Sequence, residues 1–233
     1  MDAGYFLDSG ALSGAENMAI DAALLKVAAA EQRVILRLYR WSRPTLSLGY
    51  FQKLDEVADP GFVAARAVEV VRRPTGGGAI LHDDEMTFSL AMPAGHSALA
   101  CSVDESYLAL TRPLLELIRM RGIDAKFRGE ATVPLKGINC FSGSACPDVV
   151  VGGDKVFGSA QRRRDNAVLM HGSLILGIDW PLWRGVFGQR LGQGFASLPQ
   201  LSGLDWAAEM QKAYGNALGL SWEGIPSALL QAV

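Results

Sequence analysis

Hydrophobic residues recur along the chain with two different periods, and each period predicts one kind of element. Within residues 14–30, Met18, Ala22, Leu25 and Ala29 recur at helical spacing, and no glycine or proline interrupts the interior of this segment. This pattern predicts an amphipathic helix. The alternation of apolar residues with basic or aromatic ones in residues 34–41 (VILRLYRW) instead predicts a β-strand.

The same two patterns continue through the rest of the chain. Leucine spacing predicts a helix over residues 104–120, in which Pro113 could introduce a kink. A short helix is expected over 55–67, and further helical stretches are expected from Pro181 on. Short apolar runs predict additional strands at residues 44–49, 68–71, 79–81, 86–92 and 168–176.

A β-hairpin is predicted where two valine-containing runs flank a glycine pair. Residues 149–151 and 155–157 are the two arms, and Gly152-Gly153-Asp154 lies between them. Glycine accepts the positive φ angles that a tight hairpin turn requires. Strands and helices do not alternate strictly along the chain, and no repeat or low-complexity linker divides it. We therefore expect an α/β fold, in stricter terms α+β: a mixed, largely antiparallel sheet flanked by helices, as a single catalytic domain over residues 1–233.

Composition narrows the class of protein. The chain has 233 residues, of which 49% are hydrophobic and 20% charged, enough apolar surface for a sizeable core. A net charge of −2 provides no basic field for nucleic acid. No signal peptide and no apolar run of about 20 residues is evident, so we expect a cytoplasmic protein without membrane association.

The first candidate for chemistry is the glycine-rich stretch RRPTGGG, residues 72–78. Three consecutive glycines let a ligand approach the main chain, whose N–H groups can hold an anionic or carbonyl oxygen. Arg72 and Arg73 add fixed positive charge. The stretch is neither a Walker loop nor a GxGxxG motif, and a simple surface turn is the alternative explanation.

The second candidate is Cys140, which lies in a polar loop. A free thiol has a pKa of about 8.5 and reacts poorly at neutral pH unless a cation lies nearby. Lys155, at the start of the second hairpin arm, could supply that cation. Cys146 is a rival nucleophile in the same loop, whereas Cys101 follows an apolar run and is expected to be structural. Three cysteines give no disulfide framework, and together with three histidines they show no metal-ligand spacing.

A third candidate follows Lys155. The small residues of Gly158-Ser159-Ala160 leave room for a ligand beside a strand, and His171 could orient a group or exchange a proton, although a strand histidine is more often structural. The arginines of residues 162–164 are expected to form a solvated turn or to contact an acidic partner.

Four separated stretches resemble the lipoate-protein ligase A and octanoyltransferase superfamily, covering about residues 15–180. They are residues 17–21 (NMAID), 40–52 (RWSRPTLSLGYFQ), 71–82 (VRRPTGGGAILH) and 149–176, which begins VVVGGDKVFGSAQ and ends HGSLIL. ATP-dependent ligases of the superfamily generally carry an Asn-Asp pair before the hairpin. Cysteine octanoyltransferases carry Cys-Phe fifteen residues before the hairpin lysine, and Cys140-Phe141 stands at that interval from Lys155.

The resemblance to the transferase branch implies an octanoyltransferase that acts in protein lipoylation. Cys140 would carry the acyl group as a thioester, and Lys155 would lower the pKa of that thiol. The donor would be acyl carrier protein, and the acceptor a lysine of a lipoyl domain or of the glycine-cleavage H protein. No cofactor or metal is implied. The run after Cys140-Phe141 departs from that of the branch and keeps Cys146 as an alternative nucleophile.

Two other functions stay open at this point: an ATP-dependent lipoate ligase, which would need ATP and magnesium to form an acyl-adenylate, and a non-catalytic acyl-binding relative. The expected substrate-binding residues are Arg72, Arg73, Thr75, Gly76, Gly77, Gly78, Ala79, His82, Ser159, Ala160, His171 and Gly172.

Overall fold

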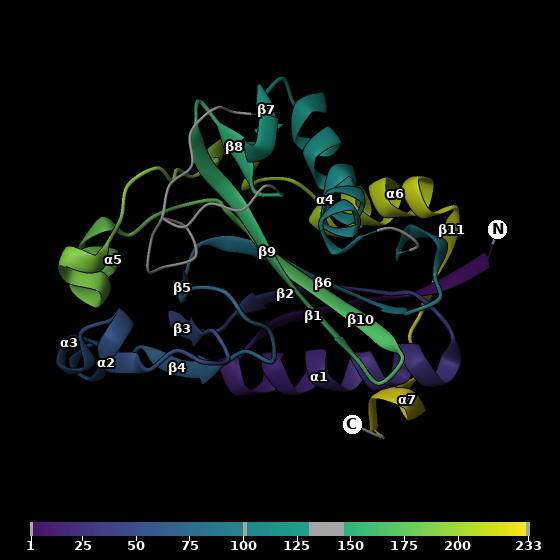
Figure 1. The fold of residues 1–233 in the computed structure, drawn as a ribbon, viewed down its shortest axis with the longest axis horizontal. Coiled ribbons are helices and arrows are strands. Elements are labelled where there is room, and N and C mark those ends of the chain that lie inside the picture. Colours follow the sequence, from purple (N-terminus) through teal and green to yellow (C-terminus); the bar gives the residue numbers. More distant parts are fainter. Residues whose placement is uncertain (1, 100–101, 131–146, 232–233) are drawn as a thin grey trace.

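The computed structural model describes residues 2–99, 102–130 and 147–231. Its main feature is an eight-stranded sheet whose strands follow one another in space as β11, β1, β2, β6, β10, β9, β8 and β7 (Figure 1). Their bounds are β1 Asp2–Leu12, β2 Ile35–Trp41, β6 Glu85–Pro93, β7 Ala125–Phe127, β8 Val149–Val151, β9 Asp154–Arg164, β10 Ala167–Ile175 and β11 Leu220–Gly224. The pairs β11–β1 and β1–β2 are parallel, and the other five pairs are antiparallel. The predicted mixed, largely antiparallel sheet is therefore confirmed; that residues 1–233 form one domain stays a prediction.

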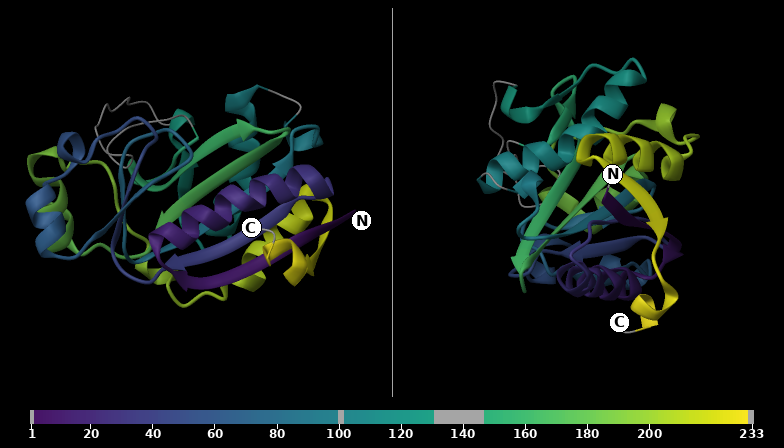
Figure 2. Two further views of the ribbon diagram at one scale, coloured as in Figure 1. Left: turned by 90° about the horizontal axis from the view of Figure 1, so that it is seen from below. Right: turned by 90° about the vertical axis from the view of Figure 1, so that its right-hand side faces the viewer.

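Helices cover both faces of this sheet. Helix α1 (Gly14–Glu31) packs on one face, and α4 (Val103–Met120) and α6 (Trp206–Leu218) pack on the other (Figures 1 and 2). The strands divide their side chains accordingly. Ile35, Ala91 and Leu169 pack with α1, whereas their chain neighbours Leu36 and Leu90 pack with α4 and α6. Because both faces are covered, β6 and β10 are buried along their full length, and so are the polar residues that they contain, Glu85, Thr87, Ser89, His171 and Ser173.

A second, three-stranded sheet lies beside the first, in the order β4 (Glu69–Arg72), β3 (Thr45–Leu48) and β5 (Ile80–His82). It packs with α2 (Leu54–Val57), α3 (Pro60–Ala65) and α5 (Trp180–Phe187), and α7 (Ser227–Gln231) ends the described chain. The single helix predicted over residues 55–67 is therefore wrong, because two short helices occupy that range. Pro60 begins α3, and the Asp59 side chain accepts a hydrogen bond from the Phe62 N–H, so the chain starts a new helix there.

Local sequence fixes where the two long helices begin. Ser13 precedes α1 and forms a capping box with Glu16, and Ser102 forms the same arrangement with Glu105 at the start of α4. The buried side of α1 differs from the predicted stripe. Ala22 is exposed, and the inward face carries the polar Asn17 and Asp21 beside apolar residues.

The hairpin of β8 and β9 forms as predicted. Gly152 and Gly153 make its turn with φ angles of 60° and 94°. The next turn is not where it was expected. Arg162 to Arg164 still belong to β9, and Asp165-Asn166 make the turn with φ angles of 53° and 62°. No helix within the described residues combines the length and apolar character that a bilayer-spanning segment needs.

Candidate functional site

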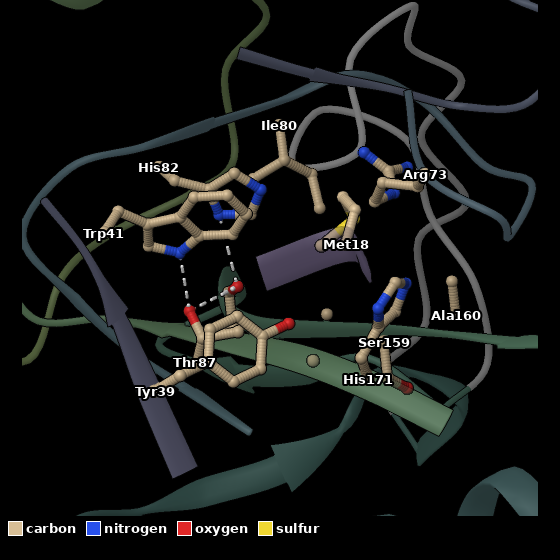
Figure 3. A pocket seen from close by; sticks show the side chains of 13 residues that line it. Met18, Tyr39, Trp41, Arg73, Ile80, His82, Thr87, Ser159, Ala160 and His171 are labelled. Atoms are coloured by element: carbon tan, nitrogen blue, oxygen red, sulfur yellow. Dashed lines mark hydrogen bonds between the residues drawn. The ribbon is translucent and has the colours of Figure 1, made fainter. Parts of the chain in front are cut away.

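A pocket lies where the large sheet, the small sheet and the first half of α1 meet (Figure 3). It holds about 320 Å³ of space, its opening included. In Figure 3, Arg73, Ala160 and His171 lie toward one side of the pocket, and Trp41 and Tyr39 lie toward the other. The residues that line it are Met18, Tyr39, Trp41, Arg73, Ile80, His82, Thr87, Gly158, Ser159, Ala160, His171, Gly172 and Ser173.

Lys155 lies at the wall of this pocket although it does not line it. Its side chain is almost wholly buried, and its Nζ lies 2.8 Å from Oδ1 of Asp148, which is equally buried. A Cβ atom placed on Gly158, a lining residue, would lie only 2.8 Å from that Nζ. The absence of a side chain at Gly158 therefore lets the ammonium reach the wall of the pocket. The structure thus places a buried charge, held by a carboxylate, beside the pocket.

One buried polar cluster joins α1 to three strands of the large sheet. Asp21 accepts hydrogen bonds from Arg37 Nη1 at 2.8 Å and from Ser89 Oγ at 2.8 Å through one oxygen, and from Tyr39 at 3.0 Å through the other. His171 Nδ1 lies 3.1 Å from that second oxygen. Burial alone would raise the pKa of Asp21, but the hydrogen bond from His171 and the charge of Arg37 outweigh it and lower the pKa.

A second cluster lies against the other side of the pocket. His82 Nδ1 is 2.6 Å from Glu85 Oε1, and its ring stacks on that of Trp41 with 3.9 Å between centroids. The Trp41 indole N–H donates to Glu85 and to Thr87. Burial lowers the pKa of His82, against the opposing charge of Glu85. Burial would raise the pKa of Glu85, but the charge of His82 and hydrogen bonds from His82, Thr87 and Ser173 lower it.

Each histidine also meets a hydroxyl group through its second nitrogen. His171 Nε2 lies 2.7 Å from Thr75 Oγ1, and His82 Nε2 lies 2.7 Å from Ser47 Oγ. A neutral imidazole satisfies both partners when Nδ1–H donates to the carboxylate and Nε2 accepts from the hydroxyl. The two arrangements have the order of a hydrolase triad, yet Ser47 and Thr75 are buried and neither lines the pocket. Their hydroxyl groups are hydrogen-bonded to the two histidines and so hold these side chains of the pocket wall in place.

The glycine-rich loop is tied to this framework by its two arginines. Arg73 Nη1 donates to the carbonyl and hydroxyl oxygens of Ser47, and Nη2 donates to the carbonyl oxygens of Gly76 and Gly78. Arg72 is exposed, and its Nη1 donates to three carbonyl oxygens of the turn at residues 49–52. Arg73 therefore holds the loop against the pocket, whereas Arg72 braces the neighbouring turn.

Known proteins share both the sequence and the shape of this chain. The model of the lipoyl protein ligase A/B catalytic domain matches residues 13–197. The octanoyltransferase LipM of Carboxydothermus hydrogenoformans is 44% identical over 77% of this chain and 67% of its own length. The LipM of Anoxybacillus flavithermus is 39% identical over 75% of this chain and 66% of its own.

The chain belongs to the lipoyl protein ligase A/B catalytic domain family. Its LipM relatives are octanoyltransferases and match most of its length, so the chain is an acyltransferase of the octanoyltransferase branch. It spans about two thirds of the length of these relatives. A bipartite lipoate protein ligase from Thermoplasma acidophilum has the same fold, with a TM-score of 0.76 at 19% identity over 100% of this chain and 92% of the ligase.

The structure divides the predicted substrate-binding residues into three groups. Arg73, His82, Ser159, Ala160, His171 and Gly172 line the pocket. Thr75 does not line the pocket but is hydrogen-bonded to the lining residue His171. The loop that Arg73 holds continues with Gly76, Gly77, Gly78 and Ala79. Arg72 lies outside the lining. A role of any of these residues in substrate binding stays a prediction.

The predicted nucleophile of this acyltransferase, Cys140, lies outside the described residues, as do its rival Cys146 and the third cysteine, Cys101. Of the predicted catalytic pair, the structure therefore describes Lys155 alone.

Several residues at or beside the pocket escaped the sequence analysis, although the sequence carried signals for them. Asp148 comes two residues before Val150, which pairs with Lys155 across the hairpin, so the predicted hairpin places an acid beside the lysine. Arg37 lies between apolar residues of a strand whose other arginine, Arg40, is exposed, and a buried arginine requires an acidic partner. Asn17 and Asp21, four residues apart on one helix face, supply the oxygen atoms that it contacts.

Proposed function

We propose that this acyltransferase moves an octanoyl group from acyl carrier protein to a lysine of a lipoyl domain or of the glycine-cleavage H protein, through a thioester on Cys140. The observation that carries the proposal is the buried ammonium of Lys155 at the wall of the pocket, held by Asp148. Desolvation opposes the burial of this ion pair, so the pair is weak evidence for a purely stabilising role. A thioester exchange gives the charge a role, since it uses a fixed positive charge beside a sulfur.

Two further observations support the same chemistry. Apolar side chains and glycine, including Met18, Ile80, Ala160 and Gly158, form much of the lining, which suits a medium-length acyl chain. The sequence resemblance pairs Cys140 with Lys155 at the interval of the cysteine octanoyltransferases, and the LipM relatives carry that activity in their name.

The reaction balances with Lys155 as the only proton carrier. The Cys140 thiolate attacks the donor thioester carbon, the carbon–sulfur bond to the carrier breaks, and the carrier thiol leaves with a proton from Lys155. The acceptor lysine amine then attacks the acyl-cysteine. The bond to Cys140 breaks, and the now neutral Lys155 takes the amine proton. N–H groups of residues 76–78 are candidates to hold the oxyanion. No ATP, metal or other cofactor enters these steps.

The test is acylation in the absence of ATP. Purified chain is incubated with octanoyl carrier protein, and intact-protein mass spectrometry measures an octanoyl adduct that hydroxylamine removes. We expect the adduct on Cys140, its loss in Cys140→Ser, and its retention in Cys146→Ser. Peptide mapping of the adduct to Cys146 would reassign the nucleophile. Transfer that requires ATP and survives Cys140→Ser would replace the proposal with the ligase reaction.

Lys155→Arg separates the two half-reactions. Guanidinium keeps the positive charge but neither donates nor accepts a proton readily. We expect this variant to form some acyl-enzyme in a single turnover and to transfer its acyl group poorly to the acceptor lysine. If Lys155→Arg slows neither acyl-enzyme formation nor transfer to the acceptor, Lys155 has no part in the mechanism.

A further inference from the structure

Two exposed aromatic side chains stand beside the glycine-rich loop. Phe51 is 88% exposed and Tyr50 is 49% exposed, and their rings meet edge to face with 4.9 Å between centroids. Two arginines flank them, Arg72 and Arg162, and these four residues are called the aromatic–arginine rim below. Adjacent exposed apolar side chains bordered by polar groups are a common mark of an interaction site.

The rim is held rigidly before any partner binds. Arg72 Nη1 donates to the carbonyl oxygens of Gly49, Tyr50 and Gln52 at 2.9, 2.9 and 2.8 Å. The Tyr50 N–H donates to the carbonyl oxygen of Thr75 at 3.1 Å, which fastens the turn to the glycine-rich loop. Binding of a partner would therefore cost little conformational entropy at this surface, because folding has already ordered it.

The rim also borders the pocket. Arg162 follows the pocket-lining Ala160 by two residues on β9, so both lie on one face of the strand. Its Nη1 donates to the carbonyl oxygen of Pro74 at 2.6 Å, and its guanidinium lies 5.5 Å from the centre of the Tyr50 ring. Gly158, which Lys155 contacts, lies four residues from Arg162, or roughly 13 Å along the strand.

The charge of the rim indicates the chemistry of its partner. Within the described residues no carboxylate forms an ion pair with Arg72 or Arg162, in a chain whose net charge is −2. Two uncompensated arginines around an apolar spot fit an acidic protein surface that presents a small apolar patch.

We infer that the aromatic–arginine rim is the docking surface for the acidic protein that carries the acyl thioester, which deepens the proposed function and rests on it. A donor docked here must reach from the rim to the wall beside Lys155, and a thioester on a long flexible arm spans that distance. A lysine side chain is shorter than such an arm, so the acceptor protein has to bind closer to the thioester than the rim lies. The rim therefore distinguishes the donor from the acceptor.

Direct binding tests this inference without any turnover. The probes are a carrier protein that bears octanoyl through a non-transferable amide bond, and a lipoyl domain with an unmodified lysine. We expect Phe51→Ser to weaken carrier binding by about tenfold, as for an aromatic group central to an interface, and to leave lipoyl-domain binding within twofold. Met120→Ser is the matched control, since Met120 is 73% exposed on α4, away from the rim.

Arg162→Gln tests the electrostatic part. Carrier binding to the wild type should weaken as salt rises, and the variant should lose part of that dependence, whereas Lys212→Gln on α6 should not. Unchanged carrier binding in Phe51→Ser, or weakening of the lipoyl domain alone, would overturn the inference. Failure of the proposed function gives a different result: the wild type would bind the octanoyl carrier and yet form no acyl-enzyme.

Discussion

Three residues together place the ammonium of Lys155 at the pocket wall. A buried ammonium requires a carboxylate, which Asp148 supplies, and it requires space, which Gly158 supplies by having no side chain. Removal of one member of such a buried pair typically costs about 3–5 kcal/mol. The lysine and the glycine could be predicted from the motif GDKVFGSAQ, but the contact between them could not, because it depends on how the side chain turns at the end of a hairpin.

Gly158→Ala should therefore impair catalysis more than folding. The new methyl group would lie 2.6 Å from Cε of Lys155, the far end of a flexible side chain that can move aside. Displacement of a catalytic group by about 1 Å can cost about 100-fold in rate, so we expect single-turnover acyl transfer to fall at least tenfold. The thermal midpoint should change little. Gly95→Ala is the control, since an added Cβ there meets no atom within 4 Å. Wild-type rates in Gly158→Ala would show that the position of Lys155 is not critical.

At the scale of elements, the sequence predicted the small sheet and the middle strands of the large sheet, and it missed β1 and β11 at one end of the large sheet and β7 at the other. Strands β6 and β10 consist mostly of apolar residues, and that pattern predicted strands over residues 86–92 and 168–176. Strand β1 contains two glycines and forms parallel pairs with β2 and with β11, which lies at the far end of the chain. The pairing of β1 with β11 joins residues more than 200 positions apart, such as Asp2 and Leu220, so no local pattern reveals it.

The polar face of α1 was missed for a related reason. An inward-facing asparagine and aspartate weaken the apolar period of a helix, and they become understandable only when Arg37 of β2 is found opposite them. Local pattern thus predicted the two long helices and most of the buried strands, but it could not predict the polar contacts between elements.

Asp21→Asn tests how much the buried polar cluster between α1 and the large sheet contributes to stability. The variant would leave the guanidinium of Arg37, which is fully buried, without its carboxylate, and it would weaken the hold on His171. We expect the free energy of unfolding to fall by about 3–5 kcal/mol in urea titrations. The exposed pair of Lys53 and Glu56 is the comparison: Glu56→Gln should cost less than about 1 kcal/mol. A cost for Asp21→Asn as small as that would show that the cluster does not hold α1 in place.

The buried histidine of the second cluster makes stability depend on pH. Folding lowers the pKa of His82, so the unfolded chain takes up the proton more readily, and the stability gained from the neutral ring is lost as pH falls below its ordinary value of 6.5. Folding also lowers the pKa values of Glu85 and Asp21, whose contributions are lost at still lower pH, below 4.5 and 3.8. Urea unfolding should therefore show highest stability near neutral pH and a decline in two stages on acidification.

Substitution of His82 tests whether this histidine causes the first stage of the decline in stability. His82→Gln should lower stability at pH 7 but flatten its decline between pH 7 and 5.5, because the titrating ring is gone. Burial also lowers the pKa of the half-buried His96. His96→Gln should therefore flatten the same decline to a smaller extent. An unchanged slope in His82→Gln would assign the pH dependence to other groups.

At the scale of the whole molecule, the pocket exists because two sheets and one helix meet. Arg73 and His82 come from the small sheet and the loop that follows it, Tyr39 and Ala160 come from the large sheet, and Met18 comes from α1 (Figure 3). The motifs of the sequence indicated most of the residues near Arg73. Toward the opposite side, His82 was expected to bind substrate, but Tyr39, Trp41 and Thr87 were not recognised, because nothing local shows that β2 ends against β5. An apolar ligand that touches all three parts should stabilise their association as well as fill the space.

The opposite side of the pocket should determine the length of the acyl chain. Trp41 lies there, stacked on His82, and its indole N–H donates to Glu85 and Thr87, each of which keeps another partner when that donor is removed. Trp41→Phe therefore opens space without leaving a buried polar group alone. Burial of each additional methylene is worth about 0.8 kcal/mol, or about fourfold, so decanoyl should gain up to about 15-fold over octanoyl in relative kcat/KM.

Competition between octanoyl and decanoyl carrier proteins measures this ratio directly, with Trp180→Phe on the partly exposed start of α5 as the control. The ratio is independent of how much enzyme is active, so a modest loss of stability in Trp41→Phe does not disturb it. A wild-type ratio in this variant would mean that the acyl chain ends elsewhere, and that the space beside Trp41 belongs to the framework of the two sheets rather than to the substrate.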